Sequence, residues 1–155
     1  MSIDMRRPGP ATNEDMLAAI ESRLAAKLPP AYRKFLLQNN GGYSHVYSVP
    51  YIDQHLKSEQ IADIFHWMSA GTTKHRDGSL GIEEGLKNMS DLLPKGVVPI
   101  AAEDGGDPIV MSLRREDYGS IYYFSGESPL DKAMNKLASS FEEFIGKLKL
   151  TRKRA

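Results

Sequence analysis

The sequence predicts a single α+β domain in which a central, mainly antiparallel sheet packs against an N-terminal helical hairpin and a C-terminal helix. Three observations support this class. Two early segments have the apolar spacing of helices, short apolar segments joined by turn residues fill the second half, and one more helical segment closes the chain. Consecutive strands joined by short turns favour an antiparallel sheet. The length of 155 residues is that of one domain.

The chain begins with a polar segment, residues 1–11, punctuated by prolines and glycine, which we expect to be a disordered leader to a domain spanning residues 12–150. Thr12 and Asp15 have the spacing of a capping box at a helix start. An apolar stripe then predicts a helix over residues 13–27. The stripe consists of Met16, Ile20, Leu24 and Leu28.

A second helix is predicted directly after the first. Pro30 suits its first turn, where a missing amide costs nothing. Residues 39–42, Asn-Asn-Gly-Gly, end it, because Asn and Gly tolerate the left-handed conformation that closes helices. Its predicted buried face is Tyr32, Phe35 and Leu36, and its predicted outward face is Arg33, Lys34 and Gln38.

The middle of the chain is harder to assign. Residues 43–52 are aromatic and β-branched but contain Pro50, which predicts an edge strand or an extended loop. Residues 60–68 fit a helix and a strand almost equally well, because the period of a short apolar segment does not separate the two. Residues 71–81 are predicted to be a polar loop. A short amphipathic helix follows, with Ile82, Leu86, Met89 and Leu93 on its apolar side.

The second half is predicted to be sheet followed by a helix. Strands are expected at residues 97–101, 109–113 and 120–124, and the second of these alternates as a half-buried strand should. Ser140 and Glu143 form another capping-box pattern at the start of the closing helix. The apolar face of that helix is Phe141, Phe144, Ile145 and Leu148.

Composition excludes several classes of protein. The chain has no cysteine, which removes disulfides, thiolate zinc sites and a cysteine nucleophile. The N-terminal sequence lacks an apolar core of signal-peptide length, and the longest strongly apolar stretch is residues 97–102. We therefore expect a soluble cytoplasmic protein that does not interact with membranes.

The formal net charge is zero, with 20 basic and 20 acidic residues, but the charges are segregated. Residues 8–146 contain 13 bases and 19 acids, so the body is acidic and the two ends are basic. Nucleic-acid binders usually show the reverse, so no nucleic-acid partner is expected. Residues 151–155 are interpreted as a solvated basic tail.

No catalytic motif is present. The serines among glycines lack a nucleophile elbow, the four histidines lack the spacing of a helical zinc site, and neither phosphate-binding glycine motif occurs. Glu103, Asp104 and Asp107 form the densest acidic cluster, but the alternation of an EF-hand fails because Gly105, Gly106 and a proline interrupt it. We therefore predict an acidic β-turn, no catalytic residue, no metal ligand and no cofactor.

Three segments together resemble the SUKH superfamily, which includes the fungal Smi/Knr cell-wall-assembly regulators. Residues 28–42, LPPAYRKFLLQNNGG, look like that family's LP-x-x-Y-R-x-FL-x-x-x-NGG signature. Residues 97–113, VVPIAAEDGGDPIVMSL, resemble its strand, GGD turn and strand. Residues 140–148 resemble its closing helix. The signature positions are structural: Leu28, Pro29, Tyr32, Phe35, Leu36, Asn40, Gly41, Gly42, Gly105, Gly106, Phe141 and Phe144.

The resemblance implies a protein-binding function. Bacterial members of the superfamily are mostly immunity proteins that neutralise a polymorphic toxin, often a nuclease, encoded by a neighbouring gene. We expect a non-catalytic module of this type, with contacts from Glu103, Asp104, Asp107 and, as an exposed aromatic anchor, Trp67. Trp67 is also interpreted as a core residue. Two alternatives stay open, a regulatory scaffold with another protein partner and a metal-dependent hydrolase that uses the acidic turn.

Overall fold

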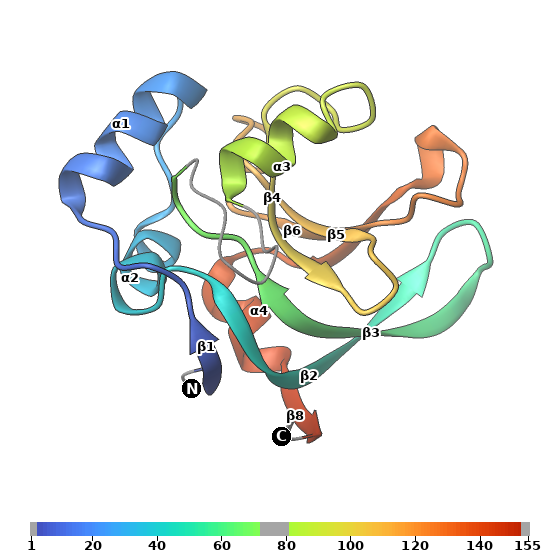
Figure 1. The fold of residues 1–155 in the computed structure, drawn as a ribbon. Helices are drawn as coiled ribbons and strands as arrows, with labels where there is room; N and C mark the ends of the chain where they lie inside the picture. Colours follow the sequence, from blue (N-terminus) through green and yellow to red (C-terminus); the bar gives the residue numbers. More distant parts are fainter. Residues whose placement is uncertain (1–2, 72–80, 153–155) are drawn as a thin grey trace.

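The protein is a strongly curved antiparallel sheet with helices packed around it (Figure 1). A computed structural model describes residues 3–71 and 81–152. The strands are β1 (Met5–Pro8), β2 (Gly42–Asp53), β3 (Ser58–Trp67), β4 (Val97–Glu103), β5 (Pro108–Ser112), β6 (Ile121–Phe124), β7 (Met134–Ala138) and β8 (Lys149–Arg152). The helices are α1 (Glu14–Leu24), α2 (Pro30–Gln38), α3 (Ile82–Asn88), α4 (Phe141–Lys147) and the 3-10 helix η1 (Leu130–Lys132).

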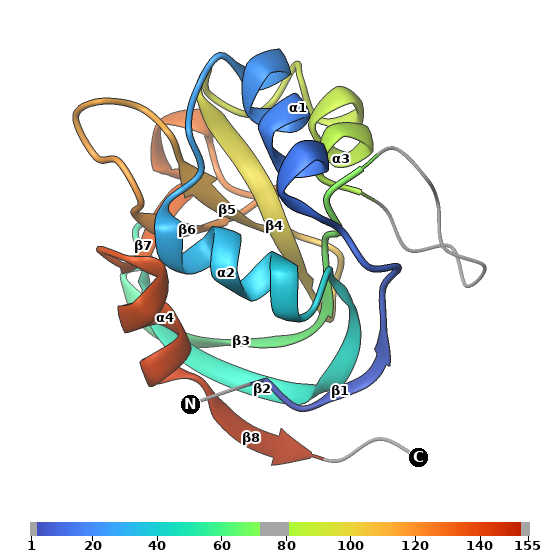
Figure 2. The ribbon, with the colours of Figure 1, turned by 90° about the vertical axis from the view of Figure 1, so that its left-hand side faces the viewer.

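The predicted α+β class is confirmed. Strands β1 to β7 are neighbours in sequence order, and all strand pairings are antiparallel. Strand β8 pairs with β2 next to the place where β1 pairs with it. The sheet curls until β7 approaches β2, where the Gln54 amide donates to Asn135 Oδ1 at 2.9 Å. In Figure 2 the helices α2 and α4 lie together above β2 and β3. None of the helices in the described part of the chain has the length and apolar character needed to cross a membrane.

The structure corrects the predicted ends of the domain. Residues 5–8 of the predicted leader form β1, and Ile3 is only 5% exposed within the core. Residues 149–152 form β8, so the predicted tail begins inside a strand. Both segments pair with β2, which satisfies backbone groups that a free end would leave to water. The prediction of a polar loop at 71–81 falls mostly on residues outside the described part.

The middle segments are resolved by tertiary pairing. Residues 60–67 of the ambiguous segment 60–68 lie in β3, so the segment is a strand and not a helix. Strand β2 is longer than the predicted edge strand and has neighbours on both sides, but Pro50 lies beyond its contacts with β1 and β8, where only β3 pairs with it. Strand β5 is buried on both faces, so the prediction that it is half-buried was wrong. Strands β1, β7 and β8 were not predicted.

The first helix is capped one residue later than predicted. Asn13, not Thr12, is the N-cap, and its side chain accepts from the Met16 amide at 2.9 Å. The helix ends at Leu24 because Ala25 adopts the left-handed conformation, with φ 55°. The Ser140 cap of α4 is confirmed, since its hydroxyl accepts from the Glu143 amide at 3.1 Å.

A buried carboxylate joins the two N-terminal helices. Glu21 is 4% exposed, accepts from the Leu28 amide at 2.7 Å and pairs with Arg33 at 3.1 Å, so Arg33 does not point outward as predicted. Arg33 also pairs with Glu14. Burial alone would raise the pKa of Glu21, but the hydrogen bonds from Arg33 and Leu28 outweigh it and the pKa is lowered.

The corner between α2 and β2 is built from Asn40, Gly41 and Gly42. The Asn40 side chain donates to the Pro10 carbonyl at 2.7 Å and accepts from the Ala70 amide at 2.6 Å. Gly42 has φ +99°, and a Cβ there would lie 2.2 Å from the Arg7 carbonyl oxygen. Only glycine allows β1 to approach β2 so closely at this point.

We expect Gly42→Ala to lower the free energy of unfolding by about 3 kcal/mol, because the new Cβ meets backbone and the φ is unfavourable. Urea unfolding followed by circular dichroism measures the change. Gly146→Ala is the control, since nothing lies within 4 Å of a Cβ added there. That helical position should gain about 0.5–1 kcal/mol. Equal effects at the two glycines would contradict this account of the corner.

We expect Glu21→Gln to lose about 1–3 kcal/mol of stability at pH 7. Because the folded pKa lies below the ordinary value of 4.5, this stabilisation is present above that value and is lost as pH falls through the folded pKa. The difference in the free energy of unfolding between wild type and variant should therefore narrow below about pH 4.5. Urea unfolding across pH 3–7 measures it, with exposed Glu116→Gln as the control. A gap independent of pH would refute the ionic role.

Candidate functional site

The turn between β4 and β5 brings together the three acidic residues predicted for partner contact. The Gly106 amide donates to the Glu103 carbonyl at 2.9 Å, and the Glu103 amide donates to the Asp107 carbonyl at 2.8 Å. Gly106 has φ +101°, which favours glycine, whereas Gly105 does not need a positive φ. Gly105 instead makes room for the Glu103 carboxylate, which would lie 2.5 Å from a Cβ at that position.

The three carboxylates have different environments. Asp107 accepts from the Tyr123 hydroxyl at 2.8 Å and from the Gly126 amide at 3.2 Å, so it ties the turn to β6 and the segment that follows. Asp104 is exposed, and its amide donates to the Asp63 carbonyl at 2.8 Å. Asp107 therefore has a structural role, and Asp104 presents the charge most accessible to a partner.

Glu103 is half-buried in an environment that disfavours its charged form. Burial raises the pKa of its carboxyl, and the neighbouring charges of Asp107 and Asp104 raise it further. Amide hydrogen bonds from Asp107 and Gly105 offset this only in part. The ionised form of Glu103 is thus less favourable in the folded protein than in water.

Two stacked tyrosines lie beside the carboxylates. The rings of Tyr51 and Tyr123 are 4.6 Å apart and nearly parallel, at 13°. Burial raises the pKa of both hydroxyls, and the hydrogen bond to Asp107 adds to this at Tyr123, so both stay protonated at neutral pH. We call Tyr51, Glu103, Asp104 and Asp107 the acidic tyrosine surface. Tyr123, at 8% exposed, is a core residue that supports this surface through its ring and its hydroxyl. The surface suits contact with cationic side chains, which pair with carboxylates and stack on aromatic rings.

The arrangement gives no support to a metal-dependent hydrolase. Within residues 3–71 and 81–152, no three His, Asp or Glu side chains form a group that could hold a metal ion. The Asp107 carboxylate accepts from Tyr123 and Gly126, and the Glu103 carboxylate accepts from the Asp107 amide at 3.3 Å. The carboxylates of Asp107 and Glu103 are thus already hydrogen-bonded within the protein.

Trp67 is a core residue, and its assignment to a contact surface was wrong. The side chain is fully buried, and its Nε1 donates to Ser44 Oγ at 2.9 Å. Its ring lies 5.4 Å from that of Phe35 and 6.2 Å from that of Phe144. The side chain faces the helices because Trp67 ends β3 on the inner side of the sheet.

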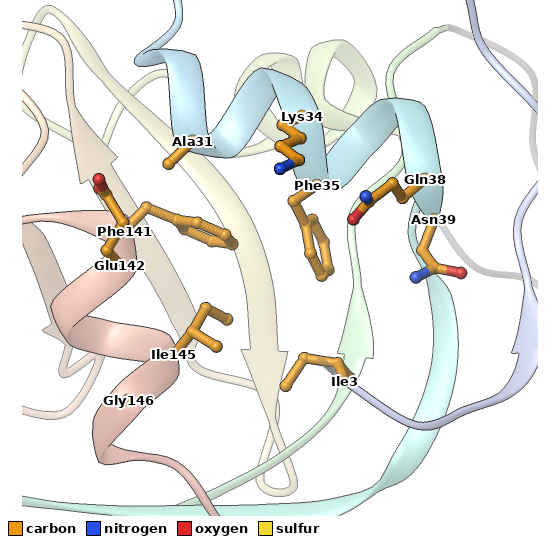
Figure 3. A pocket seen from close by; sticks show the side chains of 10 residues that line it. All are labelled: Ile3, Ala31, Lys34, Phe35, Gln38, Asn39, Phe141, Glu142, Ile145 and Gly146. Atoms are coloured by element: carbon orange, nitrogen blue, oxygen red, sulfur yellow. The ribbon is translucent and has the colours of Figure 1, made fainter. Parts of the chain in front are cut away.

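A surface hollow lies between α2 and α4, and it was not predicted from the sequence. Its volume is about 300 Å³, and Figure 3 shows the rings of Phe35 and Phe141 next to one another in its wall, with Ile3 and Ile145 nearby. The two ring centroids are 5.2 Å apart. The prediction that Phe141 is a core residue is confirmed, at 3% exposed, and Phe35 packs half-buried against the same core. Both also line this hollow. Ile3 reaches this hollow only because β1 pairs with β2.

Comparisons with known proteins identify the fold family. The model of the SMI1 / KNR4 family (SUKH-1) matches residues 10–147. The chain belongs to this family. The match contains all three segments that carry the sequence resemblance up to Lys147, including the corner at Gly42 and the acidic turn. The SUKH-1 assignment therefore covers the four helices and every strand from β2 to β7.

One curated relative is a phage protein. The chain is 29% identical over 157 residues to the SPbeta prophage-derived uncharacterized protein YokK of Bacillus subtilis (strain 168). The alignment covers 90% of this chain and 76% of YokK.

We expect Glu103→Gln to raise the free energy of unfolding at pH 7 by about 0.5 kcal/mol, a small gain because solvent screens a half-exposed carboxylate. A raised folded pKa means that the ionised carboxylate destabilises the protein once pH exceeds the ordinary value of 4.5. The gain should therefore vanish below about pH 4. Thermal unfolding across pH 3–8 measures it, and Glu116→Gln serves as the control. A loss of stability at pH 7 would disprove the unfavourable environment.

Proposed function

We propose that this SUKH-1 protein is a non-catalytic, immunity-type module that neutralises a toxin by binding it through the acidic tyrosine surface. The observation that carries the proposal is the half-buried Glu103, which has the charges of Asp104 and Asp107 near it in the same turn. A cationic partner would relieve this repulsion on binding, so an arrangement that costs the free protein stability would contribute to affinity. Membership of the family and the prophage relative support the immunity type.

The charge of the surface defines the class of partner. A nuclease must be basic where it holds phosphate, and a negatively charged surface would cover that region and accelerate encounter. The half-buried Tyr51, which stacks on the buried Tyr123, adds an aromatic ring of the kind that is common at binding hot spots. The partner we propose is thus a basic toxin encoded by the neighbouring gene, met in the cytoplasm.

We expect Asp104→Lys to weaken binding to the product of the neighbouring gene at least tenfold, because it places a cation against a basic surface. Calorimetry at low and high salt measures the affinity, which should fall as salt rises. Asp91→Lys is the matched control, since Asp91 is also exposed and lies in the segment after α3.

Coexpression tests the biological role. Growth rescued by the wild type and lost with Asp104→Lys would support neutralisation. A neighbouring product that is harmless, or one that stays toxic while bound, would refute it. Capture of a kinase or an envelope-synthesis protein in place of a toxin would favour a regulatory scaffold.

A further inference from the structure

One face of the β2–β3 hairpin is exposed and carries apolar residues beside polar ones. Partners in an antiparallel pair project to the same side of a sheet. Ser48 pairs with Asp63, Pro50 with Ile61 and Ile52 with Glu59, and these six residues define the outer β2–β3 face. The alternate residues Val49, Ala62 and Ile64 are buried beneath the helices. The outer face therefore points away from the core.

Large apolar side chains on this face are exposed to solvent. Ile52 is 62% exposed and Ile61 is 66% exposed, and Pro50 lies beside them. In Figures 1 and 2 the helices lie above β2 and β3, and no helix of the described chain lies below them. A depression of about 460 Å³ between Ser48, Ile61, Asp63 and Thr151 offers space for an incoming side chain. Contiguous exposed apolar residues of this kind mark interaction surfaces.

Residues of opposite charge flank β2 at the same position along the strand, which we call the level of Ser48. Asp63 on β3 and Lys149 on β8 are both register partners of Ser48, on its two sides. Both therefore project to the outer side. The position of Thr151 confirms the side for β8, because the Ser48 hydroxyl lies 3.1 Å from Thr151 Oγ1. Lys149 is exposed and Asp63 is half-buried.

We propose that two copies of this chain form a dimer through their outer β2–β3 faces. A two-fold axis running along β2 would lay one face on the other and place β3 of each copy over β8 of the second. Asp63 of one copy would then meet Lys149 of the other, twice, because both share the level of Ser48. Pro50 and Ile52 would pack against their own counterparts across the axis.

The same features favour a second copy over a foreign protein. Asp63 and Lys149 lie on opposite sides of β2 at the same level. A two-fold rotation about β2 therefore brings each of them onto the oppositely charged residue of the second copy. A formal net charge of zero also removes the long-range repulsion that keeps charged proteins apart. The dimer does not depend on the proposed toxin and is measured on the purified chain alone.

Sedimentation equilibrium from about 10 to about 500 µM tests the dimer. The wild type should reach dimer mass, Ile61→Asp should stay monomeric, and Asp63→Lys and Lys149→Asp should each weaken association at least tenfold. The double variant Asp63→Lys, Lys149→Asp should restore it, because the swapped charges pair again under the two-fold axis. Circular dichroism melting shows that each variant folds.

Asp91→Lys and Lys95→Asp provide matched charge changes outside the outer face, in the segment between α3 and β4, and should leave the dimer intact. A wild type that is monomeric throughout the concentration range overturns the proposal. A dimer that survives Ile61→Asp and both single charge reversals also overturns it, since association would then use another surface.

Discussion

The rest of the structure depends on the close approach of backbones at the corner between α2 and β2. Gly42 lies against the Arg7 carbonyl, and Asn40 links Pro10 to Ala70 through its side chain. These contacts join β1, the end of α2 and the segment after β3 at one point. The direction in which β2 leaves this corner decides the pairing of β3 and β8, and so both surfaces to which a function has been assigned.

The folded chain separates its charges in space. Arg6 and Arg7 lie in β1, and Lys149 and Arg152 lie in β8. Both strands pair with β2, while the acidic turn lies at the far end of β4. The segregation predicted from sequence was therefore present, but its interpretation changes. The basic residues of β1 and β8 are fixed in the sheet. The charges around the acidic tyrosine surface and the outer β2–β3 face are therefore held in place by the fold.

Periodicity and turn chemistry were sufficient wherever the structure is locally determined. The second helix, the Ser140 cap and the β4–β5 turn follow from Pro30, the serine hydroxyl and the glycines beside Glu103. Prediction failed where pairing partners are distant. Residues 5–8 and 149–152 form strands only because β2 offers unpaired backbone, and β5 is buried on both faces because a small second cluster that includes Val110 and Phe124 covers the far side.

By itself, the sequence determined the class of fold, the helical hairpin, the acidic turn and the grouping of Glu103, Asp104 and Asp107, because these depend on neighbours within a few residues. Only the tertiary structure decided that Trp67 is buried, that Tyr51 and Tyr123 stack beside the carboxylates, and that Asp63 and Lys149 share one level of the sheet. Each of these juxtapositions joins residues far apart in the chain. Strand register and sheet curvature set them, and neither leaves a local signal in the order of residues.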